Sequence, residues 1–139
     1  ENPFHIREDL KNLMWEKVGL VRNETDLKIA EEELKILEER INRVSVKGST
    51  KYNLTWQEWL NVRNLLTIAK MVTSSALIRE ESRGSHYRED FPESNDKDWL
   101  SNIYMRKGND GNPVYRIERI AQTRMNVSEL EGYKTVAKS

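Results

Sequence analysis

The chain has 139 residues, and its 23 Lys and Arg residues balance its 23 Asp and Glu residues. This length suits one domain with a modest core, and the missing basic excess argues against a nucleic-acid binder. The chain has no Cys, which excludes disulfides, thiolate catalysis and Cys-bound metal clusters. No apolar run approaches the roughly 18 residues of a membrane span. We therefore expect a cytoplasmic chain with no direct membrane insertion, and interpret Glu1 as a processing point or an artificial boundary, because no signal peptide follows it.

Three segments carry apolar residues at helical spacing and are predicted to be helices, over about residues 5–19, 25–46 and 55–81. The second steps by threes and fours like a heptad seam, and the third opens with a capping box that begins at Thr55. Their apolar positions are Ile6, Leu10, Leu13, Met14 and Val18; Leu27, Ala30, Leu34, Leu37, Ile41 and Val44; and Trp56, Trp59, Leu60, Leu65, Leu66, Ala69, Val72, Ala76 and Leu77. Such stripes can be buried only against one another, so the sequence predicts a mainly α fold, an antiparallel three-helix bundle.

The sequence changes in character after the third helix. Residues 82–98 are polar, contain Gly84 and Pro92 and show no period, so we expect a long loop. Two β-prone runs around an Asn-Asp-Gly turn then predict a small β-hairpin over about residues 101–121. The tail, residues 128–139, has little to anchor it and is expected to be flexible. One domain is therefore expected over residues 1–127.

A dense polar cluster surrounds the end of the third helix and its exit loop. Ser82, His86 and Asp90 have the residue types of a catalytic triad, but they lie within nine residues, and Gly84 and Pro92 argue against a continuous helix that would stack them. A small hydrolase is therefore disfavoured. The cluster would otherwise be a docking surface that pairs Arg with carboxylates of a partner, or an internal network that fastens the loop to the helices. The residues alone do not decide between these two.

The same cluster resembles a known signature. Residues 79–93 read Arg-Glu-Glu-Ser-Arg-Gly-Ser-His-Tyr-Arg-Glu-Asp-Phe-Pro-Glu, and residues 96–100 read Asp-Lys-Asp-Trp-Leu. This pattern is similar to one in the flavoprotein subunits of succinate dehydrogenase and fumarate reductase and in the related L-aspartate oxidases. Residues 6–10, 14–22 and 64–66 extend the resemblance, which covers roughly residues 2–120. Ser85 departs from the pattern, where Ala is common, and the tail is shorter than in many members.

The resemblance implies a spectrin-repeat-like bundle with a small β appendage, at the C-terminal end of an FAD-dependent oxidoreductase. In that family FAD and substrate are held by a flavin-binding domain and a capping domain, so no catalytic, cofactor-binding or metal-binding residue is expected in this chain. The implied partners are those two domains of the same polypeptide and an iron–sulfur subunit, which would place the chain at the inner face of the membrane. The positions that match the shared motif are candidates for the domain interface: Arg79, Ser82, Arg83, Gly84, His86, Arg88 and Asp90.

The expected role is therefore that of an accessory domain that braces a flavin domain. The alternative is a stand-alone helical adaptor that binds a partner through residues 79–92. The branch of the family stays open, although the hairpin and the Trp56 and Trp59 helix start favour the succinate and fumarate enzymes.

Overall fold

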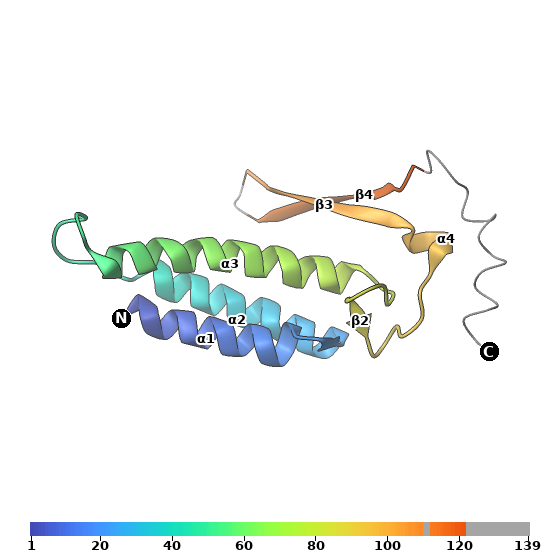
Figure 1. The fold of residues 1–139 in the computed structure, drawn as a ribbon, viewed down its shortest axis with the longest axis horizontal. Helices are drawn as coiled ribbons and strands as arrows, with labels where there is room; N and C mark the ends of the chain where they lie inside the picture. The colour runs from blue at the N-terminus through green and yellow to red at the C-terminus, as the bar shows by residue number, and fades with distance from the viewer. Residues whose placement is uncertain (110–111, 122–139) are drawn as a thin grey trace.

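A computed structural model of the chain describes residues 1–109 and 112–121. It is mainly helical, with a small antiparallel sheet (Figure 1). The elements in chain order are α1 (Pro3–Val18), β1 (Val21–Arg22), α2 (Glu24–Asn42), α3 (Leu54–Ile78), β2 (Tyr87–Arg88), α4 (Asp96–Trp99), β3 (Ser101–Lys107) and β4 (Pro113–Arg119). The predicted tail, residues 128–139, lies outside the described residues.

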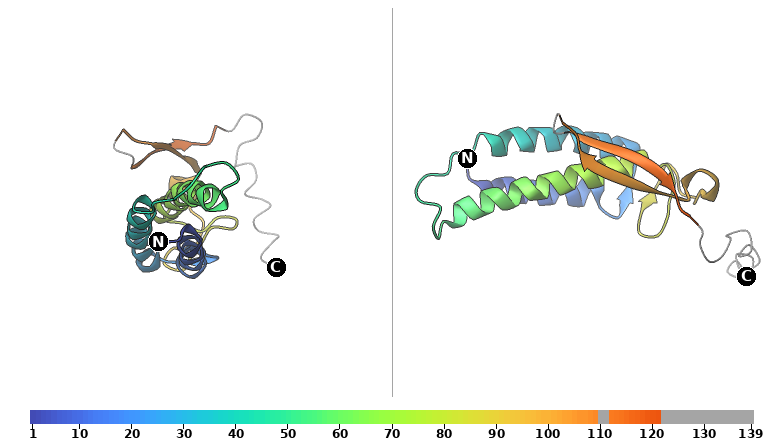
Figure 2. Two further views of the ribbon diagram at one scale, coloured as in Figure 1. Left: turned by 90° about the vertical axis from the view of Figure 1, so that its left-hand side faces the viewer. Right: turned by 90° about the horizontal axis from the view of Figure 1, so that it is seen from above.

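The three long helices lie side by side, with α2 running opposite to α1 and α3 (Figure 1). Seen end-on, they occupy the corners of a triangle (Figure 2). One apolar core fills the space between them, and it contains most of the predicted stripe positions.

The α3 stripe was predicted too broadly. Val62, Leu66 and Ala69 face the core, whereas Leu65 and Val72 are exposed on the outer side of the helix. α3 is apolar around much of its circumference, so the sequence pattern alone does not show which side the two other helices cover.

The ends of two helices differ from the prediction. α2 ends at Asn42 instead of residue 46, where two β-branched residues and Ser45 favour a helix weakly. α3 begins after Asn53, whose side-chain oxygen accepts a hydrogen bond from the backbone N–H of Trp56 at 3.1 Å. The predicted capping box at Thr55 is therefore wrong. Asn is at least as good an N-cap as Thr and lies two residues earlier.

The predicted loop at residues 82–98 contains more regular structure than expected. It includes β2, which pairs in parallel with β1 through Val21 and Tyr87, and the short helix α4. Both elements are too short to show a period in the sequence. The helix before this segment ends at Ile78 instead of residue 81, because its last carbonyl oxygens bond to a side chain from the loop.

The predicted hairpin is present as β3 and β4, which pair in register from Ser101 with Arg119 to Lys107 with Pro113. It lies beside α3, on the side away from α1 and α2 (Figure 1). Along β3, Ser101, Ile103 and Met105 are the more buried residues and alternate with exposed ones, so they face α3. The Ser75 hydroxyl of α3 contacts the sulfur of Met105.

Candidate docking site

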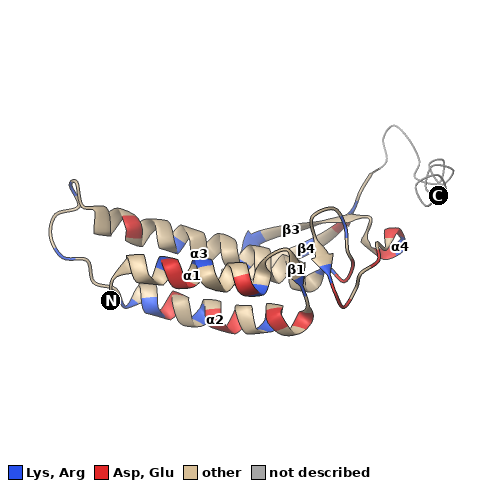
Figure 3. Ribbon diagram, turned by 60° about the horizontal axis from the view of Figure 1, so that its bottom comes forward, with Lys and Arg blue, Asp and Glu red and all other residues tan. Residues whose placement is uncertain are grey.

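The polar cluster lies where α1 ends, α2 begins and α3 ends. We call residues 79–96, together with Arg22 and Glu24, the polar joint. Figure 3 shows acidic and basic positions close together in these segments, beside β1 and α4. Whether this cluster is a free surface or an internal network depends on the partners of its individual side chains.

Arg88 and Asp90 form the centre of the joint. Arg88 is only 1 % exposed, and its guanidinium makes two parallel hydrogen bonds to the Asp90 carboxylate, at 2.7 and 2.6 Å. Its remaining nitrogen donates to the backbone oxygens of Ala76, at 2.9 Å, and Leu77, at 3.1 Å. These carbonyls have no partner within the helix, so Arg88 caps the C-terminal end of α3.

Asp90 carries the connection onward to α2. Its second carboxylate oxygen accepts a hydrogen bond from the backbone N–H of Glu24, the first residue of α2, at 2.9 Å. A carboxylate at a helix N-terminus is favoured by the free N–H groups and by the helix dipole. The hydrogen bonds from Arg88, and then that from Glu24, lower the pKa of Asp90 to about 2. One ion pair therefore ties the end of α3 to the start of α2.

Glu81 is the second centre and is fully buried. Arg83 donates to both of its carboxylate oxygens, at 2.9 and 3.1 Å, and the backbone N–H of Asn95 donates at 2.7 Å. Arg79 also bonds to Glu81, and its other nitrogen donates to the carbonyl oxygen of Ser101 at 2.6 Å. Burial is the strongest single influence on the pKa of Glu81 and raises it, but the hydrogen bonds from Arg83, Asn95 and Arg79 together lower it. Arg79, held by Glu81, therefore fastens the base of the hairpin to the end of α3.

Ser82 and His86 do not form a catalytic pair. The Ser82 hydroxyl is buried, accepts from the backbone N–H of Arg88 at 2.9 Å and donates to the backbone oxygen of Phe91 at 2.8 Å. Neither Ser82 nor Asp90 hydrogen-bonds to the His86 ring among the described residues. Ser82 and Asp90 instead bond to Arg88, and His86 lies against Arg22 and Arg79.

His86 lies half-buried between two arginines. Its Nδ1 accepts a hydrogen bond from Arg22 at 3.0 Å, and its Nε2 lies 3.3 Å from the backbone oxygen of Arg79, so that nitrogen carries the proton. Burial, followed by the positive charges of Arg22, Arg79 and Arg88, lowers the pKa of His86. A neutral ring is the form that fits this geometry, since a protonated Nδ1 could not accept from Arg22.

Gly84 forms the tip of the joint. Arg83 and His86 exchange two backbone hydrogen bonds, at 2.8 and 3.0 Å, across a tight turn. Gly84 has a φ of +58° at the first central position of that turn, where glycine is favoured. A Cβ there would meet no atom within 4 Å, so the backbone conformation is what requires glycine.

All seven candidate residues thus lie in one region, but they differ in accessibility. Ser82 and Arg88 are buried, whereas Gly84 is exposed and Arg83 and His86 are partly exposed. Sequence reasoning did not single out Arg22, Glu24 and Glu81. Arg22 and Glu81 do lie within the stretches that carry the family resemblance. The sequence does not show that Arg22 meets His86, which lies 64 residues away.

The described part of the chain offers neither a metal site nor a membrane span. Residues 1–109 and 112–121 contain no group of three or more His, Asp or Glu side chains placed to hold a metal ion. Among the same residues, no helix has both the length and the apolar character for crossing a membrane.

Comparisons with known proteins identify the family. The family described as fumarate reductase flavoprotein C-term matches residues 7–133. An uncharacterised FAD-dependent oxidoreductase of Methanocaldococcus jannaschii is 42% identical over 105 residues, and a fumarate reductase (CoM/CoB) subunit of Methanothermobacter marburgensis is 40% identical over 105. Both alignments cover 76% of this chain and 19% of the relative, so the chain spans about a fifth of the length of these relatives.

Comparison with solved structures points to the same family. A chain of the Mycobacterium smegmatis Sdh1 complex in the apo form has a TM-score of 0.84 and 31% identity, over 95% of this chain and 24% of that one. The resemblance found in the sequence is thereby confirmed. The chain belongs to the family of C-terminal domains of fumarate reductase and succinate dehydrogenase flavoproteins.

Proposed function

We propose that the chain is the accessory C-terminal domain of an FAD-dependent oxidoreductase of the succinate dehydrogenase and fumarate reductase type. Its partners are the flavin-binding and capping domains of the same polypeptide, which hold the FAD and carry out the chemistry. The proposal is supported by the family match and by the small share, about a fifth, that the chain covers of its relatives.

The polar joint is the observation that carries this role. The buried Arg88 ties α3 to α2 through Asp90, and Arg79, paired with the buried Glu81, ties the hairpin base to the end of α3. These charges are satisfied within the domain, where a broken buried pair costs several kcal/mol. Joined in this way, the helices act as a rigid, spectrin-repeat-like brace.

The accessible tip of the joint provides the contact with the partner. At this tip Gly84 is exposed and Arg83 and His86 are partly exposed, while the buried Ser82 and Arg88 hold the turn in place. We propose that this tip packs against the flavin domain. An iron–sulfur subunit is a second proposed neighbour, and through it the parent enzyme would lie at the cytoplasmic face of a membrane.

The test uses the full-length flavoprotein with Arg83→Ala or His86→Ala, and Arg43→Ala as a matched control on an exposed ion pair of α2. Both joint variants are expected to lower the melting temperature and FAD retention of the holoenzyme, with turnover per bound FAD unchanged. A variant with normal stability and assembly but without turnover would contradict the accessory role.

The adaptor alternative makes a different prediction about the gene. An open reading frame that continues upstream of the Glu1 codon into a Gly-x-Gly-x-x-Gly strand–turn–helix segment supports the flavoprotein. A start codon directly before Glu1 supports a stand-alone adaptor, and a flavoprotein in trans would then be the partner to seek.

A further inference from the structure

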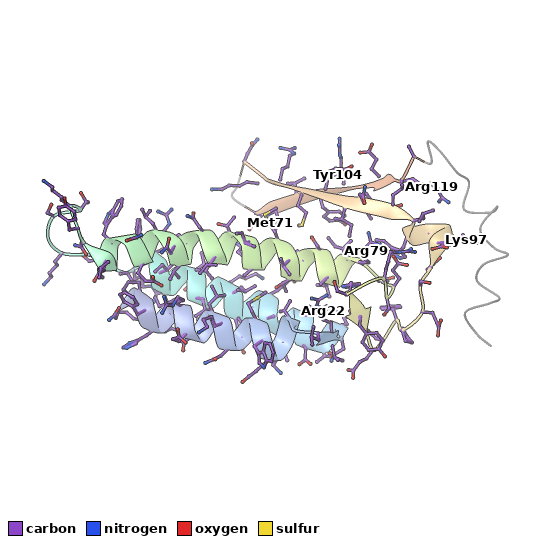
Figure 4. The ribbon with its side chains drawn as sticks, in the orientation of Figure 1. Arg22, Met71, Arg79, Lys97, Tyr104 and Arg119 are labelled. Atoms are coloured by element: carbon purple, nitrogen blue, oxygen red, sulfur yellow. The ribbon has the colours of Figure 1, made fainter. Side chains whose placement is uncertain are left out.

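The hairpin leaves an open groove on each side of α3. The groove along β3, with a volume of about 570 Å³, is lined by Ile68, Met71, Val72, Ile103 and Met105 and reaches Arg22 at one end. The groove along β4, of about 390 Å³, lies between α2, α3 and the hairpin. In Figure 4, Met71 lies on α3 below the hairpin, and Arg79 lies at the end of the same helix. We call these the β3 groove and the β4 groove.

The floor of the β3 groove is an exposed apolar stripe. Ile68 is 58 % exposed and Val72 is 41 % exposed, and they lie one turn apart on the same face of α3. Ser75 and Arg79 continue this face to the end of the helix. At 1.5 Å per residue the stripe from Ile68 to Arg79 is roughly 16 Å long, the length of about five extended residues. Covering such a surface is favourable in proportion to the apolar area removed from water.

The charges of the β3 groove are of one sign. Its ionisable lining residues are Arg22, Arg79 and His86, and no Asp or Glu is among them. Arg79 is neutralised by Glu81. Arg22 instead bonds to the backbone oxygen of Val18 and to His86, and it has no carboxylate within 4 Å among residues 1–109 and 112–121. Burial lowers the pKa of Arg22, as expected for a cation without a counter-charge.

The β4 groove differs in this respect. Its Lys70 pairs with Glu38 at 2.8 Å, and its Glu31 accepts a hydrogen bond from Ser74 at 3.0 Å. Both grooves are partly apolar, but of these two the β3 groove is the one that combines the exposed apolar stripe of Ile68 and Val72 with Arg22, which has no carboxylate partner among the described residues. An anion at that end would gain a charge-assisted, bidentate interaction with the guanidinium.

We propose that the β3 groove receives a segment of the flavin domain of the same polypeptide, apolar along Ile68 and Val72 and carrying one carboxylate that pairs with Arg22. This rests on the proposed function. The length of the stripe favours a peptide segment over a small anion, and the four fifths of the relatives' length outside this chain is the source of that segment. The groove thus adds an apolar contact beside the motif tip at Gly84.

The first test places the photo-crosslinker p-benzoylphenylalanine at Val72 of the full-length flavoprotein. Ile36, exposed on α2, is the control position, and the exposed Ser85, next to Gly84, marks the motif tip. We expect the Val72 crosslink to map to a flavin-domain peptide with an Asp or Glu among apolar residues. A crosslink only within residues 1–139, to a second copy, or to a peptide without an acid would overturn the inference.

The positions also separate the two proposals. Crosslinks to the flavin domain from Ser85 but not from Val72 leave the proposed function standing and refute the proposal for the β3 groove. No crosslink to that domain from either position refutes both.

The second test is a charge exchange. Arg22→Glu is expected to lower the yield of the Val72 crosslink by about tenfold, because like charges face each other across the interface. Changing the mapped carboxylate to Arg in the same protein should restore the yield. If the yield is unchanged in a folded Arg22→Glu protein, or is not restored by the exchange, the pairing is wrong; if Arg22→Glu does not fold, the crosslink of the parent sequence at Val72 still decides the inference.

Discussion

The apolar core and the polar joint hold the same three helices in different ways. The core is built from residues three and four positions apart, so each helix contributes a stripe that is visible in its own sequence. The joint is built from single side chains that bridge segments far apart, such as Asp90 with Glu24 and Arg22 with His86, 66 and 64 residues apart. A local pattern therefore predicts the first region, whereas the second requires the fold.

The largest loss of stability is expected from a substitution at the centre of the polar joint. Arg88→Ala removes the guanidinium that donates to three backbone carbonyls and to the Asp90 carboxylate, and should lower the free energy of unfolding by about 4 kcal/mol. Urea unfolding of the chain measures this value. Arg43→Ala, at an exposed pair on α2, should change it by less than about 0.5 kcal/mol. If Arg88→Ala lowers the free energy of unfolding no more than Arg43→Ala does, the polar joint contributes little to the stability of the fold.

A substitution in the apolar core should lower the free energy of unfolding slightly less. Leu34 is buried in the centre of α2, so Leu34→Ala should cost about 3 kcal/mol through lost transfer energy and the cavity left behind. Ile36 lies two residues away on the exposed side, and Ile36→Ala should stay within about 0.5 kcal/mol. Equal costs at the two positions in the same unfolding experiment would mean that α2 buries a different face.

Acid should weaken the joint before the core. The pKa of Asp90 is about 2 in the folded chain and about 4 when unfolded. A depressed pKa stabilises the fold above the unfolded value, and that stabilisation is lost as pH falls from about 4 to about 2. Because Asp90 is partly exposed, we expect a loss of about 1 to 2 kcal/mol. In Asp90→Asn this part of the pH dependence of stability should vanish. If the pH dependence is unchanged in that variant, the Asp90 carboxylate does not stabilise the fold as described.

The smallest effect concerns the start of α3. Asn53→Ala should cost about 1 kcal/mol, because the backbone N–H of Trp56 loses its acceptor. Thr55→Ala is the matched control and should be neutral within about 0.5 kcal/mol, since that hydroxyl is not the cap. Thermal unfolding of both variants checks that Asn53 is the N-cap of α3. If Thr55→Ala is the more destabilising of the two, the predicted capping box at Thr55 is correct after all.

How far the sequence predicts each feature follows from this comparison. The helices and the hairpin were predictable because periodic apolar residues, and two β-prone runs separated by Asn-Asp-Gly in the sequence, are local signals. The end of α3 was not predictable, because it is set by the guanidinium of Arg88, which lies ten residues further along the chain. The pairing of β1 with β2 was missed because strands of two residues are too short to show a period.

The candidate site was predictable in position but not in arrangement. The dense run from Arg79 to Asp90 marks it, and the family resemblance selects seven of its residues. Which of them are buried, and that Arg22 joins them, depends on contacts across the fold. That Arg22 lacks a carboxylate partner among the described residues likewise becomes visible only after the neighbouring carboxylates have been placed.

A double-mutant cycle between Arg88 and Asp90 tests the central claim most directly, namely that this ion pair joins α2 to α3. The chain would be unfolded in urea as the parent sequence, as Arg88→Met, as Asp90→Asn and as the double variant. A coupling energy of about 2 kcal/mol is expected, because the pair is bidentate and one partner is fully buried. Single-variant effects that add within about 0.5 kcal/mol would contradict the claim.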